Sequence, residues 1–169
     1  VYHCAAAIDH LPFEEMKNIN MRGTENVINV ALAMGIKKFC HVSSIAALGE
    51  AVGNRAVNEV DFFNLDGLNT DYAITKFGAE MEAWRGNQED MDVIIINPGV
   101  IIGEGNWERG SGQLISKTAS GNKFYTKGSS GFIDVRDVTR AMQYLTESDL
   151  KNERYILVSE NKTYREVLD

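Results

Sequence analysis

The sequence has 169 residues, of which 44% are hydrophobic and 24% are charged, the balance of a globular protein with one sizeable core. Its 17 Lys and Arg against 24 Asp and Glu give a net charge of −7. That charge argues against a nucleic-acid-binding or anionic-membrane surface, because such surfaces need a basic face. No apolar run approaches the roughly 20 residues of a membrane span, and the first ten residues lack the basic start of a signal peptide.

Two cysteines, Cys4 and Cys40, lie in apolar segments and have no metal-ligand spacing. We therefore expect reduced core thiols in a cytoplasmic protein and no metal site.

The first third of the chain predicts strand, helix and strand. VYHCAA (1–6) is typical of a short buried strand. Residues 12–35 predict a helix, with apolar side chains at positions 27, 28, 31, 32 and 34, and Gly35 would end it. KKFCHVSS (37–44) predicts a second strand.

A long polar loop and a second helix follow. Residues 45–70 contain Gly and Asn and predict the loop. Residues 70–86 predict the helix, with Thr70 or Asp71 as its N-cap and Gly86 at its end.

The remaining segments continue the alternation of strands and helices. MDVIIINPG (91–99) is a continuous β-branched run, the pattern of a strand buried on both faces. Residues 111–121 predict a short helix and residues 123–128 a strand. A strand end leads into a helix over 132–148, and RYILVS (154–159) predicts another strand.

Acidic residues mark the starts of the last helices. Asp134 is expected to cap the helix that follows it, with Asp137 in its first turn. Thr163 and Glu166 form a capping-box pattern only a few residues before the last one. Because the chain also opens directly on a strand, we expect it to be a fragment of a longer protein.

Alternating strands and helices with continuously apolar strands predict an α/β fold with a parallel sheet. In such sheets ligands bind at the carboxyl ends of the strands. The polar residues at these ends lie in HCAA (3–6), SSIAALG (43–49) and NPGVIIGEGNW (97–107). A candidate site should draw on these three segments.

Four side chains near these ends could support proton transfer. Tyr72 and Lys76 are four positions apart on a predicted helix and so share one face. An ammonium close to a phenol favours the phenolate, and lowering the phenol pKa by about three units requires roughly 4 kcal/mol. Ser43 and Ser44 follow the second strand, and a serine hydroxyl there could bind the oxygen of a carbonyl or alcohol.

Each of these residues also has a purely structural interpretation. Ser43 and Ser44 could end a strand and bond local backbone, while Tyr72 and Lys76 could be an ordinary pair on a helix face. His3, close to the same strand ends, is better explained as a histidine satisfied by backbone than as a catalyst.

Six segments in order resemble motifs of the extended short-chain dehydrogenases/reductases, also called the NAD-dependent epimerase/dehydratase family. They match the family's V-x-H-x-A-A, N-x-x-G-T-x-N-V-x-x-A, catalytic-serine, Y-x-x-x-K-x-x-x-E, R-P-G-x-V-x-G-P and F-[IV]-x-V-x-D-V motifs. The segments are VYHCAA (1–6), NMRGTENVINVA (20–31), HVSSIAALG (41–49), YAITKFGAE (72–80), INPGVIIGEG (96–105) and FIDVRDV (132–138). The dihydroflavonol-reductase-like branch is the most similar.

The resemblance implies a Rossmann-like parallel sheet with flanking helices, incomplete at its N-terminus, plus part of a small substrate lobe. Residues 1–100 would be the later part of the dinucleotide-binding domain. Residues 101–169 would contain segments of the substrate lobe as well as further strands and helices of the Rossmann-like domain. The whole chain would form a single compact unit.

The resemblance also implies roles for individual residues. Tyr72 would be the general acid/base, Lys76 would lower its pKa and bind the nicotinamide ribose, and Ser44 would bind the reacting oxygen. Asn20 would either support the active-site strand end or hold a bend in its helix. The implied cofactor-binding residues are Cys4, Ala5, Ala6, Ser43, Tyr72, Lys76, Pro98, Gly99 and Val100.

The sequence departs from the family pattern at several places. No G-x-x-G-x-x-G phosphate loop is found in it, and the residue that selects NAD or NADP is also missing. Asn97 stands in place of the Arg of R-P-G, and Glu104 in place of the Pro that follows the second glycine. Trp107, in the same region, could line a substrate pocket or pack on the core.

We therefore expect an NAD- or NADP-dependent oxidoreductase that reduces a carbonyl or oxidises a secondary alcohol. One alternative is a sugar-nucleotide epimerase or dehydratase, and another is a binding module that senses a dinucleotide without turnover. The expected partners are a small-molecule substrate and a second copy of the chain, with neither nucleic acid nor membrane.

Overall fold

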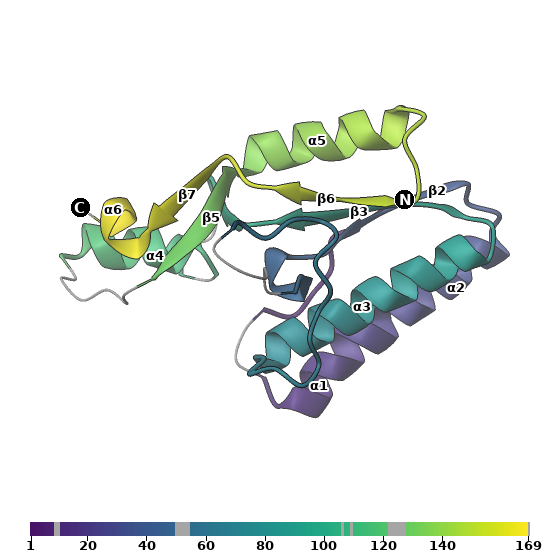
Figure 1. Ribbon diagram of the computed structural model, residues 1–169, viewed down its shortest axis with the longest axis horizontal. Helices are drawn as coiled ribbons and strands as arrows, with labels where there is room; N and C mark the ends of the chain where they lie inside the picture. The colour runs from purple at the N-terminus through teal and green to yellow at the C-terminus, as the bar shows by residue number, and fades with distance from the viewer. Residues whose placement is uncertain (9–10, 50–54, 106, 109, 122–127, 169) are drawn as a thin grey trace. The chain divides into compact units, whose positions relative to one another are not determined.

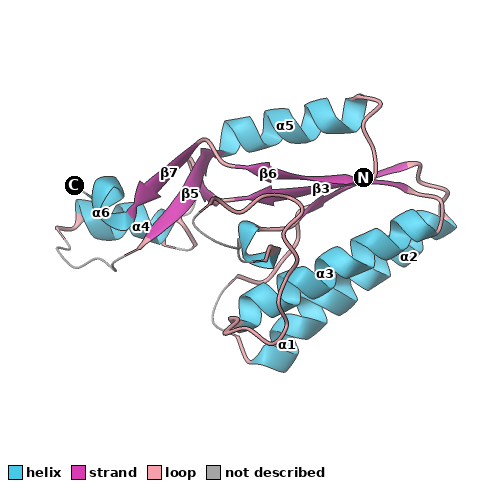
Figure 2. Cartoon of the chain, in the orientation of Figure 1, coloured by secondary structure: helices cyan, strands magenta, loops and turns pink. Residues whose placement is uncertain are grey.

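The computed structural model describes residues 1–8, 11–49, 55–105, 107–108, 110–121 and 128–168 (Figures 1 and 2). The chain forms two compact units. The first comprises Val1–Asn97 and Met142–Ile156, and the second comprises Pro98–Ala141 and Leu157–Asp169.

A four-stranded sheet organises the first unit. Its order is β1-β2-β3-β6, formed by β1 (Tyr2–His3), β2 (Lys38–Val42), β3 (Asp92–Pro98) and β6 (Glu153–Leu157). The β1–β2 and β2–β3 pairs are parallel, as the continuous apolar runs predicted. The first strand is shorter than predicted: it ends at His3, and residues 4–8 form no regular element.

The helix predicted over residues 12–35 consists of three consecutive pieces. They are α1 (Phe13–Lys17), a π-helical turn (Asn18–Arg22) and α2 (Gly23–Ala33). Gly35 has a φ of 66°, the left-handed conformation that suits a glycine just past a helix end. The prediction for Gly35 is therefore confirmed.

Helix α3 (Asp71–Gln88) lies beside α2 on one face of the sheet (Figure 1). Thr70 is its N-cap, because the Thr70 hydroxyl accepts a hydrogen bond of 3.1 Å from the amide of Ala73. Gly86 does not end the helix as predicted. It is buried, and a Cβ at this position would come within 2.7 Å of the Met91 side chain, so its small size serves packing.

The core of this unit lies between the sheet and the helices α2 and α3. Its fully buried members are Ile28, Ala31, Phe39, Ala83, Met91, Val93 and Ile95. The other face of the sheet is covered by the C-terminal part of α5 (Val135–Glu147), whose Met142 and Leu145 are buried (Figure 1).

The two cysteines differ in environment. Cys40 is buried on the α5 side of the sheet, near the Thr146 side chain. Cys4 is exposed, so the prediction that it is a core thiol is wrong. The reason is that β1 ends one residue before it.

The second unit contains a separate three-stranded sheet of order β4-β5-β7. Strand β4 (Val100–Ile102) pairs in parallel with β5 (Ser129–Asp134), and β7 (Glu160–Thr163), which was not predicted, pairs with β5 in antiparallel fashion. The unit also contains the helices α4 (Gly112–Ala119) and α6 (Tyr164–Leu168) and the first part of α5. Most of the strand predicted over 123–128 falls outside the described residues.

The predicted helix caps of this unit are confirmed. The Asp134 carboxylate accepts a hydrogen bond of 2.7 Å from the amide of Arg136 at the start of α5. Thr163 and Glu166 form the reciprocal capping box: each backbone amide donates to the other side chain, at 2.8 and 3.2 Å.

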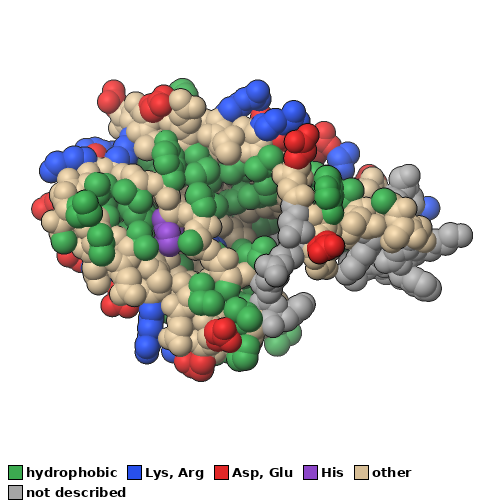
Figure 3. Space-filling view, turned by 180° about the vertical axis from the view of Figure 1, so that it is seen from behind, with side chains coloured by type: hydrophobic (Ala, Val, Ile, Leu, Met, Phe, Trp, Pro, Cys, Tyr) green, Lys and Arg blue, Asp and Glu red, His purple; other side chains and the backbone are tan. Residues whose placement is uncertain are grey.

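Among the helices that the structure describes, none is long and apolar enough to cross a bilayer. On the face shown in Figure 3, Lys and Arg side chains are interspersed with Asp and Glu rather than gathered in one basic patch.

Candidate functional site

Two hydroxyl groups meet just past the carboxyl end of β2. Ser44 follows this strand and caps a short 3-10 helix (Ile45–Ala47), its side-chain oxygen accepting a hydrogen bond of 3.1 Å from the Ala46 amide. The phenol of Tyr72, in the first turn of α3, lies beside the same Ser44 side chain and interacts with it. The fold thus brings together two predicted site residues from distant parts of the sequence.

The environment of Tyr72 shifts its pKa in the opposite direction to the prediction. Burial raises the pKa of the half-buried phenol, and the interaction with the Ser44 side chain only partly opposes this. We expected the Lys76 ammonium to lower it, and that expectation is wrong for this structure. Desolvation outweighs the stabilisation of the phenolate, so the phenol holds its proton more tightly than in water.

Lys76 lies one turn further along α3 and is almost completely buried, with 2% of its surface exposed. Its ammonium donates a hydrogen bond of 2.8 Å to the carbonyl of Val42, the last residue of β2. Burial lowers the pKa of Lys76 to about 8, although the Glu80 carboxylate acts against this shift. The ammonium is thus held at the carboxyl end of β2, close to its titration point at neutral pH.

Ser43 does not face the Ser44–Tyr72 pair but takes part in a buried network. Its hydroxyl donates a hydrogen bond of 2.7 Å to Glu80, whose side chain is fully buried on α3. The Asn97 amide nitrogen donates to the same carboxylate oxygen at 3.0 Å and to the Ser44 carbonyl at 2.9 Å. Sequence reasoning missed the role of Glu80 and Asn97, although Glu80 is the last residue of the Y-x-x-x-K-x-x-x-E match.

Asn20 holds the segment that follows β1. Its side chain accepts a hydrogen bond of 2.7 Å from the Ala7 amide and donates one of 3.1 Å to the Ala7 carbonyl. It also donates to the Thr75 hydroxyl of α3 at 3.0 Å. Asn20 itself lies buried in the π-helical turn.

This anchoring leaves the start of the segment open to a ligand. Cys4 and Ala5 are exposed and Ala6 is half-buried. Solvent therefore reaches this end of the segment.

The two described histidines of this region are structural. His3 is bonded through Nε2 to the Thr24 hydroxyl at 2.9 Å, and its ring stacks on His41 at a centroid distance of 5.4 Å. Both ring nitrogens of the buried His41 lack a hydrogen-bond partner among the described residues. Burial lowers the pKa of both histidines, and the nearby Lys76 lowers it further. Both rings are therefore neutral at physiological pH.

Three predicted cofactor contacts follow Asn97. Pro98 ends β3, and Gly99 and Val100 continue into the second unit. The Gly99 amide donates a hydrogen bond of 3.0 Å to the carbonyl of Leu157. A Cβ at Gly99 would come within 2.3 Å of the Gly131 carbonyl oxygen, so only glycine fits there.

The second unit has a pocket of about 530 Å³. Trp107 lines it, and the other lining residues are Ile102, Gly103, Glu104, Ile115, Asp134, Val135 and Arg136. The walls are polar and apolar in similar measure, and the charged groups include an Asp134–Arg136 ion pair of 2.6 Å.

The model of the male sterility protein family, a family of NAD-binding domains, matches residues 1–143. A sterol demethylase protein B of Methylococcus capsulatus is 29% identical over 176 residues, which cover 99% of this chain and 52% of that protein. A putative dihydroflavonol 4-reductase of Synechocystis is 29% identical, with 92% of this chain and 47% of that protein covered. The chain thus spans about half the length of the curated relatives it matches.

Solved structures agree with this assignment. The crystal structure of gox2253 superposes with a TM-score of 0.90 at 28% identity, over 99% of this chain and 52% of that one. A Thermus thermophilus UDP-glucose 4-epimerase, solved with NAD, has a TM-score of 0.82 at 21% identity, over 99% and 59%, and shares the fold. The fold, the motif order and the family match together show that the chain belongs to the male sterility protein family of NAD-binding domains, within the extended short-chain dehydrogenases/reductases.

Proposed function

We propose that this chain carries the proton-transfer site of an NAD- or NADP-dependent oxidoreductase that reduces a carbonyl compound. The observation that supports this most strongly is that the Tyr72 and Ser44 side chains lie beside each other, with the buried Lys76 ammonium one helical turn away. All three lie at the carboxyl end of a parallel strand, where sheets of this kind bind ligands.

Each of the three groups has a separate task in this proposal. The Tyr72 phenol gives its proton to the substrate oxygen as that oxygen becomes an alkoxide. The Ser44 hydroxyl donates a hydrogen bond to the same oxygen and steadies it. The Lys76 ammonium has three N–H donors, of which the Val42 carbonyl takes one, and the others suit the hydroxyls of a ribose.

The residues around this site fit a nicotinamide cofactor. Cys4 and Ala5 are exposed and leave room for a flat ligand to approach, and the buried Lys76 gives a fixed cation at the strand end. When bound, the nicotinamide would supply the hydride that the carbonyl carbon receives. In this proposal the cofactor also contacts five further residues, namely Ala6, Ser43, Pro98, Gly99 and the backbone of Val100.

The shifted pKa of Tyr72 favours the direction of reduction. A phenol whose pKa is raised by burial remains protonated at neutral pH and is ready to donate. Several relatives carry names of reductases, among them a cinnamoyl-CoA reductase 1 of Arabidopsis thaliana that is 27% identical. These names support reduction but do not identify the substrate of this chain.

A sugar-nucleotide epimerase or dehydratase is the second candidate. A UDP-glucose 4-epimerase of Vibrio cholerae is 31% identical over 114 residues, which cover 62% of this chain. The same Tyr72 phenol could serve that reaction, since it too passes protons at an alcohol or carbonyl oxygen.

For the whole protein we propose a small-molecule substrate, a homodimer and a cytoplasmic location.

Substitution of Tyr72 tests the proposed function. In the whole protein, Tyr72→Phe removes the proton donor but keeps the ring, so we expect hydride transfer to slow by about 100- to 10,000-fold. The measurement is oxidation of NADH and NADPH with a panel of carbonyl compounds, beside epimerisation of UDP-sugars. Tyr144→Phe, at an exposed tyrosine of α5, is the matched control. Full activity in Tyr72→Phe would refute the assignment.

A further inference from the structure

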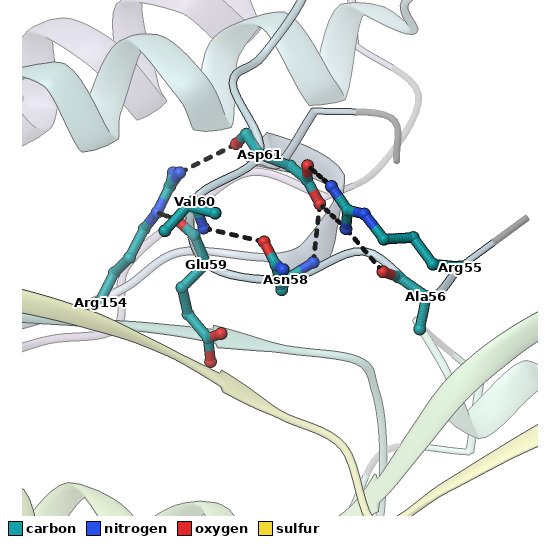
Figure 4. Close-up of polar contacts among 7 residues, drawn as sticks. All are labelled: Arg55, Ala56, Asn58, Glu59, Val60, Asp61 and Arg154. Atoms are coloured by element: carbon teal, nitrogen blue, oxygen red, sulfur yellow. Dashed lines mark hydrogen bonds and ion pairs between the residues drawn. The ribbon is translucent and has the colours of Figure 1, made fainter. Parts of the chain in front are cut away.

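The guanidinium of Arg154, on β6, joins a loop to helix α3. It donates hydrogen bonds to the Glu59 carbonyl at 2.6 Å and to the Asp61 carbonyl at 3.0 Å (Figure 4). It also donates to the Glu80 carboxylate of α3 at 3.1 Å. Only 15% of the Arg154 side chain is exposed, so these contacts are shielded from water.

The same loop is held by further contacts of its own. The Glu59 side chain points toward β6 and accepts a hydrogen bond of 2.9 Å from the Ile156 amide (Figure 4). The Asp61 carboxylate accepts from the Asn58 amide and from Arg55, each at 2.8 Å. Residues 55–61 are therefore docked on β6 as a unit, and Arg154 is the residue that links them to α3.

Glu80 passes this connection on to the proposed site. One oxygen of its carboxylate receives Arg154, and the other receives Ser43 and Asn97. Asn97 in turn donates to the carbonyl of Ser44. A fully buried carboxylate needs a charged partner, because an unpaired buried charge is costly. Arg154 pairs with Glu80 at 3.1 Å and holds its carboxylate in place.

We propose that Arg154 is a positioning residue for the Ser44–Tyr72 pair, an inference that rests on the proposed function of that pair. Without the guanidinium, the Glu80 carboxylate loses the donor that fixes one of its two oxygens and can rotate away from its present position. Asn97 then loses one of its two acceptors and the Ser44 carbonyl loses its fixed donor. The Ser44 hydroxyl shifts relative to Tyr72, and a small misplacement of such a group slows a reaction strongly.

The experiment compares Arg154→Met and Arg154→Lys with a control, Arg85→Met, in the whole protein. Arg85 also forms ion pairs on α3, with Glu82 and Glu89. Two readouts are taken: amide hydrogen exchange at Ala46, which reports on Ser44, and at Ile156, which reports on the loop. Both amides donate to the groups in question. Steady-state kcat and KM are measured on the same variants.

We expect Arg154→Met to speed exchange at Ala46 and at Ile156 by about ten-fold or more, and to lower kcat by about 10- to 100-fold with little change in KM. Arg154→Lys keeps the charge beside Glu80, but one ammonium cannot reach all three acceptors. In this variant Ala46 protection and kcat should recover in part, while Ile156 remains fast. The control should match the wild type.

Wild-type exchange at Ala46 together with wild-type kcat in Arg154→Met would overturn the positioning role, even if the loop opens. If Arg154→Met does not fold, the test uses Arg154→Lys with the same readouts. Faster exchange at Ala46 in Arg154→Lys than in the control supports the positioning role of Arg154. Exchange equal to that of the control rejects it. Full activity of Tyr72→Phe would instead reject the proposed function, and exchange at Ala46 would still test the positioning.

Discussion

At the scale of single residues, burial decides the chemistry more than identity does. Tyr72 and Lys76 were chosen as a phenol and a cation four positions apart. Desolvation raises the pKa of the phenol and lowers that of the ammonium, so that each moves toward its neutral form. The two thiols also differ in burial: Cys4 is exposed, whereas Cys40 is buried.

The difference between the thiols predicts selective alkylation. Burial raises the pKa of Cys40 to about 11, which leaves almost no thiolate at pH 8. Iodoacetamide at pH 8 should therefore label Cys4 in the folded protein, with Cys40 at least about 100-fold slower until denaturant is added. Mass spectrometry of peptides gives the two rates, and Cys4→Ser serves as the control. Equal labelling of both thiols before unfolding would contradict the burial of Cys40.

At the scale of elements, polar side chains hold irregular segments against the regular ones. The loop over residues 55–70 contains neither helix nor strand. Arg154 ties it to β6, and Phe63 stacks on Phe77 of α3 at a centroid distance of 4.6 Å. Asn20 fixes the segment after β1 in a similar way. Such contacts join residues far apart in sequence, so periodicity does not reveal them.

Replacing Asn20 should destabilise the first unit. Asn20→Ala removes three hydrogen bonds and leaves the amide and carbonyl of Ala7 without this partner, so we expect the free energy of unfolding to fall by about 2–4 kcal/mol. Chemical denaturation measures the change. Asn26→Ala, at an exposed position of α2, is the matched control and should stay within about 0.5 kcal/mol. A loss as small as that of the control would show that Asn20 does not anchor the segment.

At the scale of the whole molecule, the buried Lys76 couples folding to pH. Its pKa is about 8 in the folded protein against 10.5 for an unperturbed lysine. Between these values the unfolded state binds more protons, so the Lys76 contribution makes stability rise with pH across this window. The two pKa values correspond to about 3 kcal/mol. Cys40 and Tyr72, whose pKa values are raised, act in the opposite direction.

A comparison with Lys76→Met isolates this contribution. The free energy of unfolding of the wild type minus that of Lys76→Met should increase by about 3 kcal/mol between pH 8 and 10.5. Urea unfolding at a series of pH values measures it. Lys37→Met replaces an exposed lysine and should leave the pH dependence as in the wild type. If the free-energy difference between the wild type and Lys76→Met stays constant or falls between pH 8 and 10.5, Lys76 is not a desolvated ammonium.

Local patterns in the sequence predicted the elements and the family. Continuous β-branched runs predicted β3, the Thr70 cap predicted the start of α3, and the Y-x-x-x-K-x-x-x-E match led to Tyr72 and Lys76. These succeed because helix periodicity, capping and strand burial depend on neighbouring residues. The end of α3 was misplaced because Gly86 is small for packing against Met91, a contact that local sequence does not contain.

By itself, the sequence determined the α/β class, the membership in an NAD-binding family and the residues worth testing. Only the tertiary structure decided the direction of the pKa shift of Tyr72, the exposure of Cys4 and the link from Arg154 to Glu80, which lie 74 positions apart. The physical reason is that desolvation and hydrogen bonding depend on every atom around a group. Most of those atoms come from residues that are distant along the chain.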